Sequence, residues 1–313
     1  MPSKKPLLNA TENSIFYQSN FGYKNKAAAL VKIKKRTNKE NIPFEILHTN
    51  ADGDYLFLKE KIENEGITDI VICGGDGTVS QIAALLIDED INIGIIPMGS
   101  GNGLALAAKI PTNVNKALNI IFKGKGKYID SFYINDTFSC MLCGLGFDAQ
   151  VAHDFAKQPS RGLGTYIKQS VRNFISAKPY AFEIVDKGKS FATEAFFISI
   201  ANSNQFGNQF TIAPQASLCD GLLDIVVVKK MSKFRMLLAV INQIMAGKIN
   251  EHDEKTFHKK DILYFQTSHL IIYNLGKAPL HIDGDPAYAA KKYTIKIIPD
   301  AFKLIQPVSK KIT

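Results

Sequence analysis

Between about Ser14 and Lys127, short apolar runs rich in β-branched residues alternate with segments of helical periodicity. This alternation predicts a parallel sheet whose strands are joined by crossover helices. The predicted pairs of strand and helix are Phe44 to His48 with Asp54 to Glu65, Ile70 to Cys73 with Val79 to Asp88, and Ile91 to Pro97 with Asn102 to Lys109.

After about Ile129 the pattern changes to closely spaced strands separated by turns, which predicts an antiparallel β domain. Two helical patterns, Tyr166 to Ser176 and Ser232 to Ala246, interrupt it. The predicted strands are Ala181 to Val185, Ala195 to Ala201, Leu222 to Val228, Ile262 to Phe265, His269 to Asn274 and Tyr293 to Ile298.

The length and composition fit this two-part organisation. A chain of 313 residues with 46% hydrophobic and 21% charged residues can form two domains with separate cores. No apolar run reaches the roughly 18 residues of a membrane-spanning helix, and the first residues lack the apolar region of a signal peptide. We therefore expect a cytoplasmic protein.

The four cysteines are too few for a disulfide framework, so we expect reduced thiols. Cys140 and Cys143 have the spacing of a redox or zinc site. The sequence has no second pair beside them, so packing in the core is the favoured interpretation.

A net charge of +9 indicates an anionic partner. The basic residues form small dispersed groups without a nucleic-acid motif or an aromatic stacking surface, so we expect no nucleic-acid partner. Solvated faces are the simplest interpretation, and peripheral binding to an anionic membrane surface is the next.

The most informative motif is Gly74-Gly-Asp-Gly-Thr78, which follows a buried strand and precedes a helix. Glycines let the backbone approach phosphate oxygens, and a helix N-terminus adds a favourable dipole, so the motif predicts a phosphate site. The alternative is an ordinary tight turn in which Asp76 or Thr78 caps the helix.

A second glycine turn, Gly99-Ser-Gly-Asn102, follows the next predicted strand. Ligands of parallel sheets bind at the carboxyl ends of the strands, so the two turns are expected to hold opposite sides of one nucleotide. Neither turn matches the Walker A or dinucleotide-binding patterns.

These two turns resemble the catalytic domain of diacylglycerol, sphingosine and ceramide kinases, and in particular their soluble bacterial relatives. The resemblance continues in order through most of the chain, in Ile129-Asp130, Gly144-Leu-Gly-Phe-Asp148, Ile212-Ala-Pro-Gln-Ala216, Asp220-Gly-Leu-Leu-Asp224 and Ile282-Asp-Gly-Asp285-Pro286.

The resemblance implies an N-terminal α/β nucleotide-binding domain of residues 1–128 with a returning segment 299–313. It also implies a C-terminal antiparallel β-sandwich of residues 129–298 that helps to bind the lipid. The residues expected to bind ATP are Thr49, Gly74, Gly75, Asp76, Gly77, Thr78, Val79, Ser80, Gly99, Ser100, Gly101 and Asn102.

The resemblance further implies magnesium sites. Asp76 and Asp130 would organise a catalytic Mg²⁺, which prefers oxygen ligands and bridges phosphates. A separate, largely structural Mg²⁺ would be held by Asp220 and the carbonyl groups of Ser217 and Leu222. A turn residue remains the alternative for Asp130, and a plain β-turn remains the alternative at Asp220.

The acceptor hydroxyl needs a general base, and the resemblance assigns this role to the acidic residue that ends an Asp-Gly-Glu motif. Here the motif reads Asp283-Gly284-Asp285, so the candidate base Asp285 is one methylene shorter. Asp76 is the rival base, and a turn residue before Pro286 is the structural alternative.

One departure from the family lies near the N-terminus. Close relatives have an Asn-Pro-x-Ser-Gly phosphate loop after the first strand, whereas this chain has Tyr17 to Lys24 without proline. Gly22 and Lys24 are candidates for a similar role.

The resulting hypothesis is an ATP- and Mg²⁺-dependent lipid kinase acting on diacylglycerol or a sphingoid base. The alternatives are an NAD kinase and a catalytically inactive lipid-binding relative. The sequence does not indicate an oligomeric state.

Overall fold

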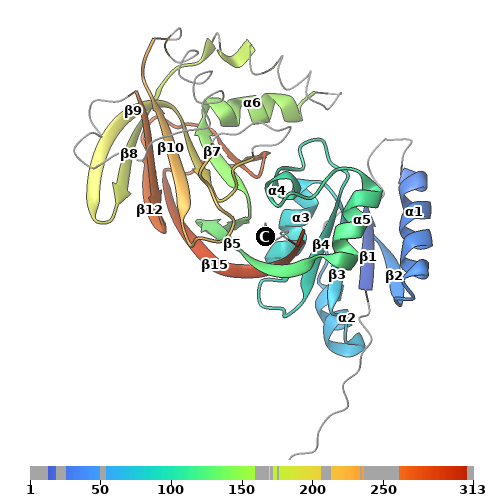
Figure 1. The fold of residues 1–313 in the computed structure, drawn as a ribbon. Coiled ribbons are helices and arrows are strands. Elements are labelled where there is room, and N and C mark those ends of the chain that lie inside the picture. Colours follow the sequence, from blue (N-terminus) through green and yellow to red (C-terminus); the bar gives the residue numbers. More distant parts are fainter. Residues whose placement is uncertain are drawn as a thin grey trace, which may run out of the picture.

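The computed structural model describes residues 13–18, 26–49, 54–158, 169, 172–174, 176–205, 213–232, 235 and 261–308. Figure 1 shows two lobes, an α/β lobe that contains the N-terminal strands and a β lobe formed mainly by later strands. Among the described residues, no helix is both long and apolar enough to cross a membrane.

The N-terminal lobe contains a parallel sheet in the order β2-β1-β3-β4. In β3 and β4 five consecutive residues are buried, because helices cover both faces of the sheet. Figure 1 shows α3 and α4 on the side that faces the β lobe, with α1 and α5 on the opposite side. The elements are β1 (Asn13–Gln18), α1 (Lys26–Lys39), β2 (Phe44–Thr49), α2 (Phe57–Glu65), β3 (Asp69–Gly74), α3 (Asp76–Leu85), β4 (Asn92–Pro97), α4 (Gly103–Ala107) and α5 (Val114–Lys123).

The second lobe is antiparallel around β9, which pairs with β7, β8 and β10. Buried and less buried positions alternate along β8 and β12, as expected for strands with one face on the core. The further elements are β5 (Lys125–Ile134), β6 (Thr137–Ser139), β7 (Leu142–Gly146), α6 (Phe147–Ala156), β8 (Tyr180–Asp186), β9 (Lys189–Ala201), β10 (Leu223–Lys229), β11 (Ile262–Thr267), β12 (His269–Asn274), β13 (Leu280–Ile282), β14 (Asp285–Ala287) and β15 (Lys292–Gln306).

The long strands β5 and β15 run from one lobe into the other (Figure 1). One end of β15 pairs antiparallel with β12, and the other end pairs parallel with β4. The register between β15 and β5 shifts between Ile298 and Phe302, where Asp300 has a φ of 51°. The predicted division between residues 128 and 129 falls inside β5 and stays a prediction.

The predicted fold class, an α/β domain followed by an antiparallel β domain, is confirmed. Several boundaries differ from the predictions. Helix α3 begins at Asp76 rather than at Val79, because Gly75 has extended backbone angles and takes the N-cap position. The strand predicted at Tyr293 to Ile298 continues to Gln306 by pairing with β5.

Other elements were not predicted or can be judged only in part. The sequence patterns did not indicate α1, α5 or α6. The described residues between 166 and 176 are helical, whereas the pattern at 232–246 lies almost wholly outside the described residues.

Candidate active site at the junction of the lobes

The two glycine turns lie side by side at the ends of the neighbouring strands β3 and β4. Met98 N donates a hydrogen bond to Gly74 O at 2.9 Å. A Cβ atom added to Gly99 would lie 2.5 Å from Gly75 Cα, and one added to Gly75 would lie 3.0 Å from Gly99 Cα. Glycine at both positions therefore lets the two turns pack backbone against backbone.

Asn102 shapes the second turn from within. Its side-chain Oδ1 accepts a hydrogen bond from Gly99 N at 2.8 Å, and its Nδ2 donates one to Gly99 O at 2.8 Å. Asn102 is buried and has a φ of 53°, a left-handed conformation that asparagine tolerates. Ser100, in contrast, is exposed.

The first glycine turn leads directly into the ten-residue helix α3. The N-cap Gly75 has no side chain, and the first intrahelical bond runs from Val79 N to Gly75 O. The preceding N–H groups of the first turn have no partner within the helix, and the helix dipole is positive there, so this end favours an anion.

Asp76 lies in the first turn of α3 and is partly buried. Its Oδ1 accepts a hydrogen bond from Leu104 N, at the start of α4, at 3.3 Å. Burial raises the pKa of the Asp76 carboxyl to about 6, and the nearby Asp283 charge acts in the same direction. Backbone N–H groups at Gly103, Leu104 and Asn102 partly oppose the shift.

The candidate base comes from the other lobe. Asp283 and Gly284 have φ values of 50° and 87° and form a two-residue turn between β13 and β14, for which Asp-Gly is a favoured pair. Asp285 is the first residue of β14 and is exposed. Its Oδ2 lies 3.0 Å from the position that a Cβ atom on Gly77 would take. The tertiary fold thus brings Asp285 to the first turn of α3.

Asp283 fixes this hairpin, a role that the sequence analysis did not assign. Its carboxylate accepts hydrogen bonds from the hydroxyls of Ser80 at 2.7 Å and Ser139 at 2.6 Å. It also accepts from backbone N–H groups of residues 140–142 at 3.1 to 3.3 Å. Ser80 belongs to α3, so Asp283 connects this helix to the hairpin that carries Asp285. An aspartate in an Asp-Gly pair is typical of turns, which gave no signal of this role.

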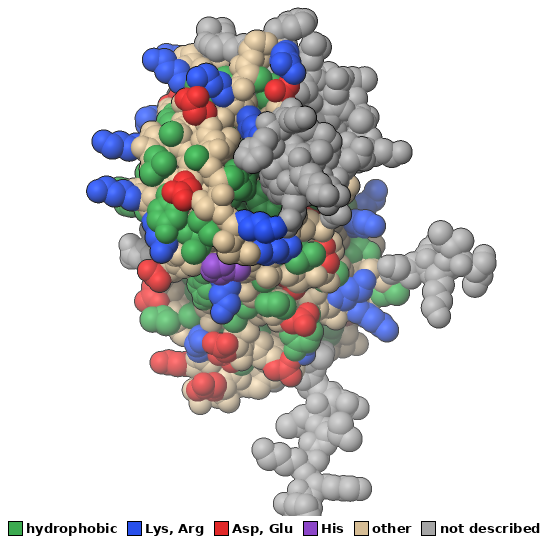
Figure 2. Space-filling view, turned by 90° about the vertical axis from the view of Figure 1, so that its left-hand side faces the viewer, with side chains coloured by type: hydrophobic (Ala, Val, Ile, Leu, Met, Phe, Trp, Pro, Cys, Tyr) green, Lys and Arg blue, Asp and Glu red, His purple; other side chains and the backbone are tan. Residues whose placement is uncertain are grey.

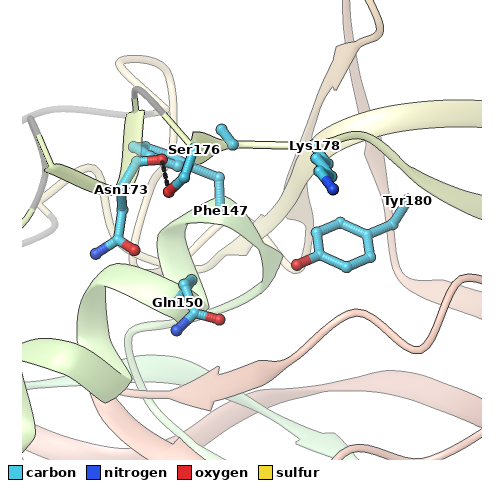
Figure 3. A pocket seen from close by; sticks show the side chains of 7 residues that line it. Phe147, Gln150, Asn173, Ser176, Lys178 and Tyr180 are labelled. Atoms are coloured by element: carbon cyan, nitrogen blue, oxygen red, sulfur yellow. Dashed lines mark hydrogen bonds between the residues drawn. The ribbon is translucent and has the colours of Figure 1, made fainter.

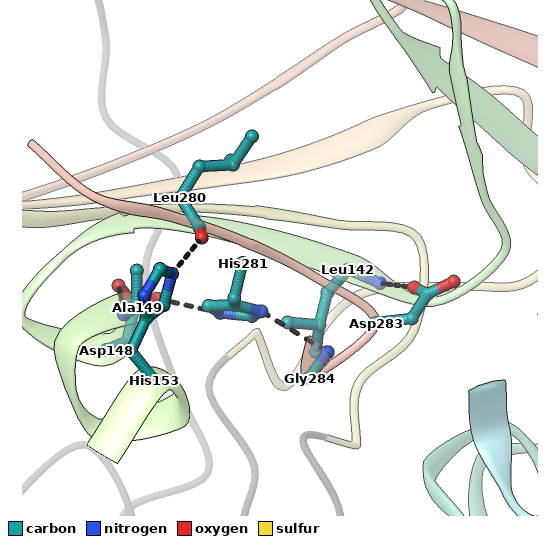
Figure 4. Close-up of polar contacts among 8 residues, drawn as sticks. All are labelled: Leu142, Asp148, Ala149, His153, Leu280, His281, Asp283 and Gly284. Atoms are coloured by element: carbon teal, nitrogen blue, oxygen red, sulfur yellow. Dashed lines mark hydrogen bonds and ion pairs between the residues drawn. The ribbon is translucent and has the colours of Figure 1, made fainter. Parts of the chain in front are cut away.

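A buried pair of side chains lies behind the hairpin (Figure 4). His281 Nδ1 accepts the N–H of Gly284 at 3.3 Å, and His281 Nε2 faces Asp148 Oδ2 at 3.5 Å. Both side chains are buried. A Cβ on Gly144 would lie 1.9 Å from Asp148 Oδ2, so the glycine of this motif provides room for the pair.

Asp130 and Asp220 form a separate acidic site. Both carboxylate oxygens of buried Asp130 accept backbone hydrogen bonds, from Gly221 N at 2.7 Å and from Asp300 N at 2.9 Å. Burial raises the pKa of Asp220, and the Asp130 charge adds to the shift. A cation near these carboxylates would relieve their repulsion, so their oxygens suit Mg²⁺. These contacts place Asp130 beside the Asp220 turn.

Other predicted residues have more limited roles in the described geometry. Thr78 and Val79 are buried, and Thr49 ends β2. The segment containing Gly22 and Lys24 lies outside the described residues.

Cys140 and Cys143 are buried, and burial raises the pKa of both thiols well above the usual value. Among the described residues there is no cluster of three His, Cys, Asp or Glu side chains that could hold a metal ion.

A cavity of about 260 Å³ lies beside α6, and Figure 3 shows aromatic and polar side chains around it. The helix α6 also packs against β13 and β14, the two strands of the Asp285 hairpin. The lining residues are Phe147, Gln150, Asn173, Ser176, Ala177, Lys178 and Tyr180.

Comparison with known families matches both lobes. Residues 14–134 match the diacylglycerol kinase catalytic domain, and residues 142–306 match the YegS C-terminal NAD kinase beta sandwich-like domain. This chain belongs to the diacylglycerol kinase family. The expected resemblance and the expected enzyme class, a lipid kinase, are thereby confirmed.

Relatives of this diacylglycerol kinase family member include a "Probable lipid kinase YegS-like" protein from Shewanella frigidimarina, 29% identical, with 80% of each chain covered. A diacylglycerol kinase from Bacillus subtilis is 25% identical over 76% of this chain and 77% of the relative. The chain spans 57% of a longer uncharacterized protein from Synechocystis. The crystal structure of a diacylglycerol kinase from Bacillus anthracis superimposes on this chain with a TM-score of 0.72 at 20% identity. The superposition covers 95% of this chain and 97% of the other, so the two proteins share a fold.

Proposed function

We propose that this kinase transfers the γ-phosphoryl group of Mg-ATP to a hydroxyl of a membrane lipid such as diacylglycerol or a sphingoid base. The observation that carries the proposal is the position of Asp285. A carboxylate from the β lobe stands against Gly77, in the first turn of the helix that follows the glycine motif.

The nucleotide phosphates would lie against the two packed glycine turns, at the N-terminus of α3. Backbone N–H groups of that helix turn supply donors that no side-chain cap occupies. Exposed Ser100 can add a hydroxyl from the second turn, while Asn102 acts indirectly by holding that turn. Thr78 and Val79, being buried, would contribute through their backbone.

The donor set fits magnesium at two places. Asp76 would hold the catalytic ion near the phosphates, where Mg²⁺ neutralises charge as the phosphoryl group moves. Asp220, with the carbonyl groups of Ser217 and Leu222, would hold a structural ion. Asp130, which the resemblance assigns to the catalytic ion together with Asp76, lies beside this second site and would contribute there, because its carboxylate accepts the N–H of Gly221. The like charges of Asp130 and Asp220 support this second site.

The phosphoryl acceptor is a lipid hydroxyl, and Asp285 would take its proton. Asp285 is exposed at the junction of the lobes, whereas Asp76 is turned toward Leu104. This difference favours Asp285 as the base. The cavity beside α6 would receive part of the lipid, because α6 packs against the hairpin that carries Asp285.

The test is phosphoryl transfer from ATP to a panel of diacylglycerol, sphingoid bases, ceramide and NAD. NAD belongs in the panel because the matched C-terminal domain is described as similar to that of NAD kinases. We expect Mg²⁺-dependent phosphorylation of a lipid. Phosphorylation of NAD alone would replace the proposal by an NAD kinase, and lipid binding without turnover would indicate an inactive relative.

A further inference from the structure

Two loops of the β lobe lie side by side next to the hairpin of β13 and β14 that carries Asp285. They are residues 275–279, between β12 and β13, and residues 288–291, between β14 and β15. Buried Asn274 joins them, because its Nδ2 donates hydrogen bonds to Ala278 O at 2.9 Å and Ala290 O at 3.2 Å. Its Oδ1 accepts from Ala278 N at 2.7 Å. We call these two loops, together with Lys292, the loop pair.

The loop pair exposes apolar and basic side chains together. Tyr288 is fully exposed, and Leu275 is 61% exposed. Lys277, Lys291 and Lys292 are exposed beside them. The chain has no aspartate or glutamate at residues 267–282 or 286–299, so both loops carry positive charge only. In Figure 2, basic side chains stand out along the upper left edge of the molecule, whereas acidic side chains gather lower on the same face.

The loop pair is linked to both parts of the proposed lipid site. Tyr288 follows Asp285 by three residues. On the other side, Gly276 N donates a hydrogen bond to Ala181 O at 2.8 Å, next to Tyr180 of the cavity lining. A surface bound at the loop pair would therefore be near both the candidate base and the cavity.

We infer that the loop pair is the surface by which this enzyme docks on an anionic bilayer. The inference rests on the proposed function, which places the substrate in a membrane. Tyr288 and Leu275 would enter the interfacial region, where tyrosine is favoured, and the lysines would bind anionic headgroups. Lysine suits this role because its aliphatic stem can lie on apolar surface while its charge reaches the headgroups.

Binding to vesicles of phosphatidylcholine, with and without phosphatidylglycerol, tests the docking surface. We expect Lys291→Glu/Lys292→Glu to weaken binding to the anionic vesicles by at least about 25-fold, since each lysine near such a surface contributes about fivefold and each glutamate adds repulsion. The double variant Leu275→Ser/Tyr288→Ser should also bind the anionic vesicles more weakly, at high salt as well as at low salt. The matched control is Lys32→Glu/Lys35→Glu on α1, where exposed Val31 adjoins exposed lysines in the other lobe.

Equal losses in the loop-pair and α1 charge variants would overturn the inference in favour of non-specific attraction. Unchanged binding in both loop-pair variants, or a wild-type protein that ignores anionic vesicles, would also overturn it. Capture of a soluble nucleic acid or protein by the loop pair, without vesicle binding, would assign it to another partner.

Kinetics separate docking from chemistry. With a soluble short-chain diacylglycerol, the loop-pair variants should turn over like the wild type, whereas with vesicle-embedded substrate they should lose at least about tenfold. Equal losses on both substrates would contradict docking. If the wild type phosphorylates no lipid but its vesicle binding still depends on the loop pair, the proposed function fails and the docking surface stands.

Discussion

At the scale of single residues, Asp285 carries the proposed chemistry. Asp285→Asn keeps the size of the side chain and removes its capacity to accept a proton. We expect turnover to fall by about 10²- to 10⁴-fold with near-normal ATP binding. Asp285→Glu should retain far more activity, because it restores the longer acid of the family. Steady-state kinetics of the two variants test this assignment. Equal turnover of Asp285→Asn and Asp285→Glu would move the role of general base to Asp76.

The ionised Asp76 carboxylate destabilises the folded protein, and this effect can be measured without substrate. A carboxyl pKa of about 6 in the folded protein, against an ordinary 3.8, means that the folded state binds the proton more tightly than the unfolded state. The contribution of Asp76 to wild-type stability should therefore become more favourable as the pH falls from 6 toward 3.8. Asp76→Asn should stabilise the metal-free protein by up to about 3 kcal/mol above pH 6, and the gain should disappear below about pH 4.

Urea unfolding at the two pH extremes, without Mg²⁺ or ATP, measures this change. The stabilised variant should also lose turnover, because Asp76 would no longer hold the catalytic ion. A gain in stability that did not vary with pH would show that ionisation of Asp76 is not its cause.

His281 is expected to position the turn that precedes Asp285. His281→Phe fills similar space but removes the acceptor for Gly284 N–H, so turnover should fall by about ten- to a hundredfold with little change in the KM for ATP. His281→Asn offers an oxygen near the position of Nδ1 and should restore much of the activity. His153→Phe is the matched control, because His153 bonds Leu280 O on the same hairpin away from the turn.

Loss of stability would accompany the loss of turnover in His281→Phe, since buried Asp148 would lose its facing imidazole. Thermal unfolding of all three variants separates the effects. If His281→Asn matched His281→Phe in turnover, the hydrogen bond to the turn would not matter for catalysis.

At the scale of elements, the two glycine turns are expected to function as one unit. A methyl group in Gly75→Ala would meet the backbone of Gly99, whereas one in Gly77→Ala would meet the carboxylate of Asp285. Backbone can yield less than the end of a side chain, so Gly75→Ala should abolish ATP binding. Gly77→Ala should bind ATP and lower turnover by displacing Asp285. Calorimetric titration with an ATP analogue, together with kinetics, tests the pair, and the reverse order of effects would contradict the geometry.

At the scale of the whole molecule, β5 and β15 make the two lobes interdependent. Both strands are continuous across the junction, and Asp130 on β5 accepts the N–H of Asp300 where β15 shifts register. Residues of both lobes also share one buried hydrophobic cluster. We therefore expect a single cooperative thermal transition by calorimetry. Two well-separated transitions would show that the lobes unfold independently.

The sequence alone determined features that depend on neighbouring residues. Continuous apolar runs predicted β3 and β4, and alternation with a period of 2 residues predicted β12, because both patterns follow from local backbone geometry. The glycine motifs are also local, because each needs only a strand, a turn and a helix in succession. Gly74 to Thr78 could therefore be recognised in the sequence. Helix α1 was missed because its lysines obscured the amphipathic pattern, and α6 because its first residues formed part of a motif.

Only the tertiary structure decided how the motifs meet. The bond between Ser80 and Asp283 joins positions 203 residues apart, and the approach of Asp285 to Gly77 depends on the same closure. No local pattern encodes such a contact, because it depends on how β13 and β14 pack against the opposite lobe. For the same reason, Asp283 and His281 could be assigned a positioning role only from their distances to Ser80 and Gly284.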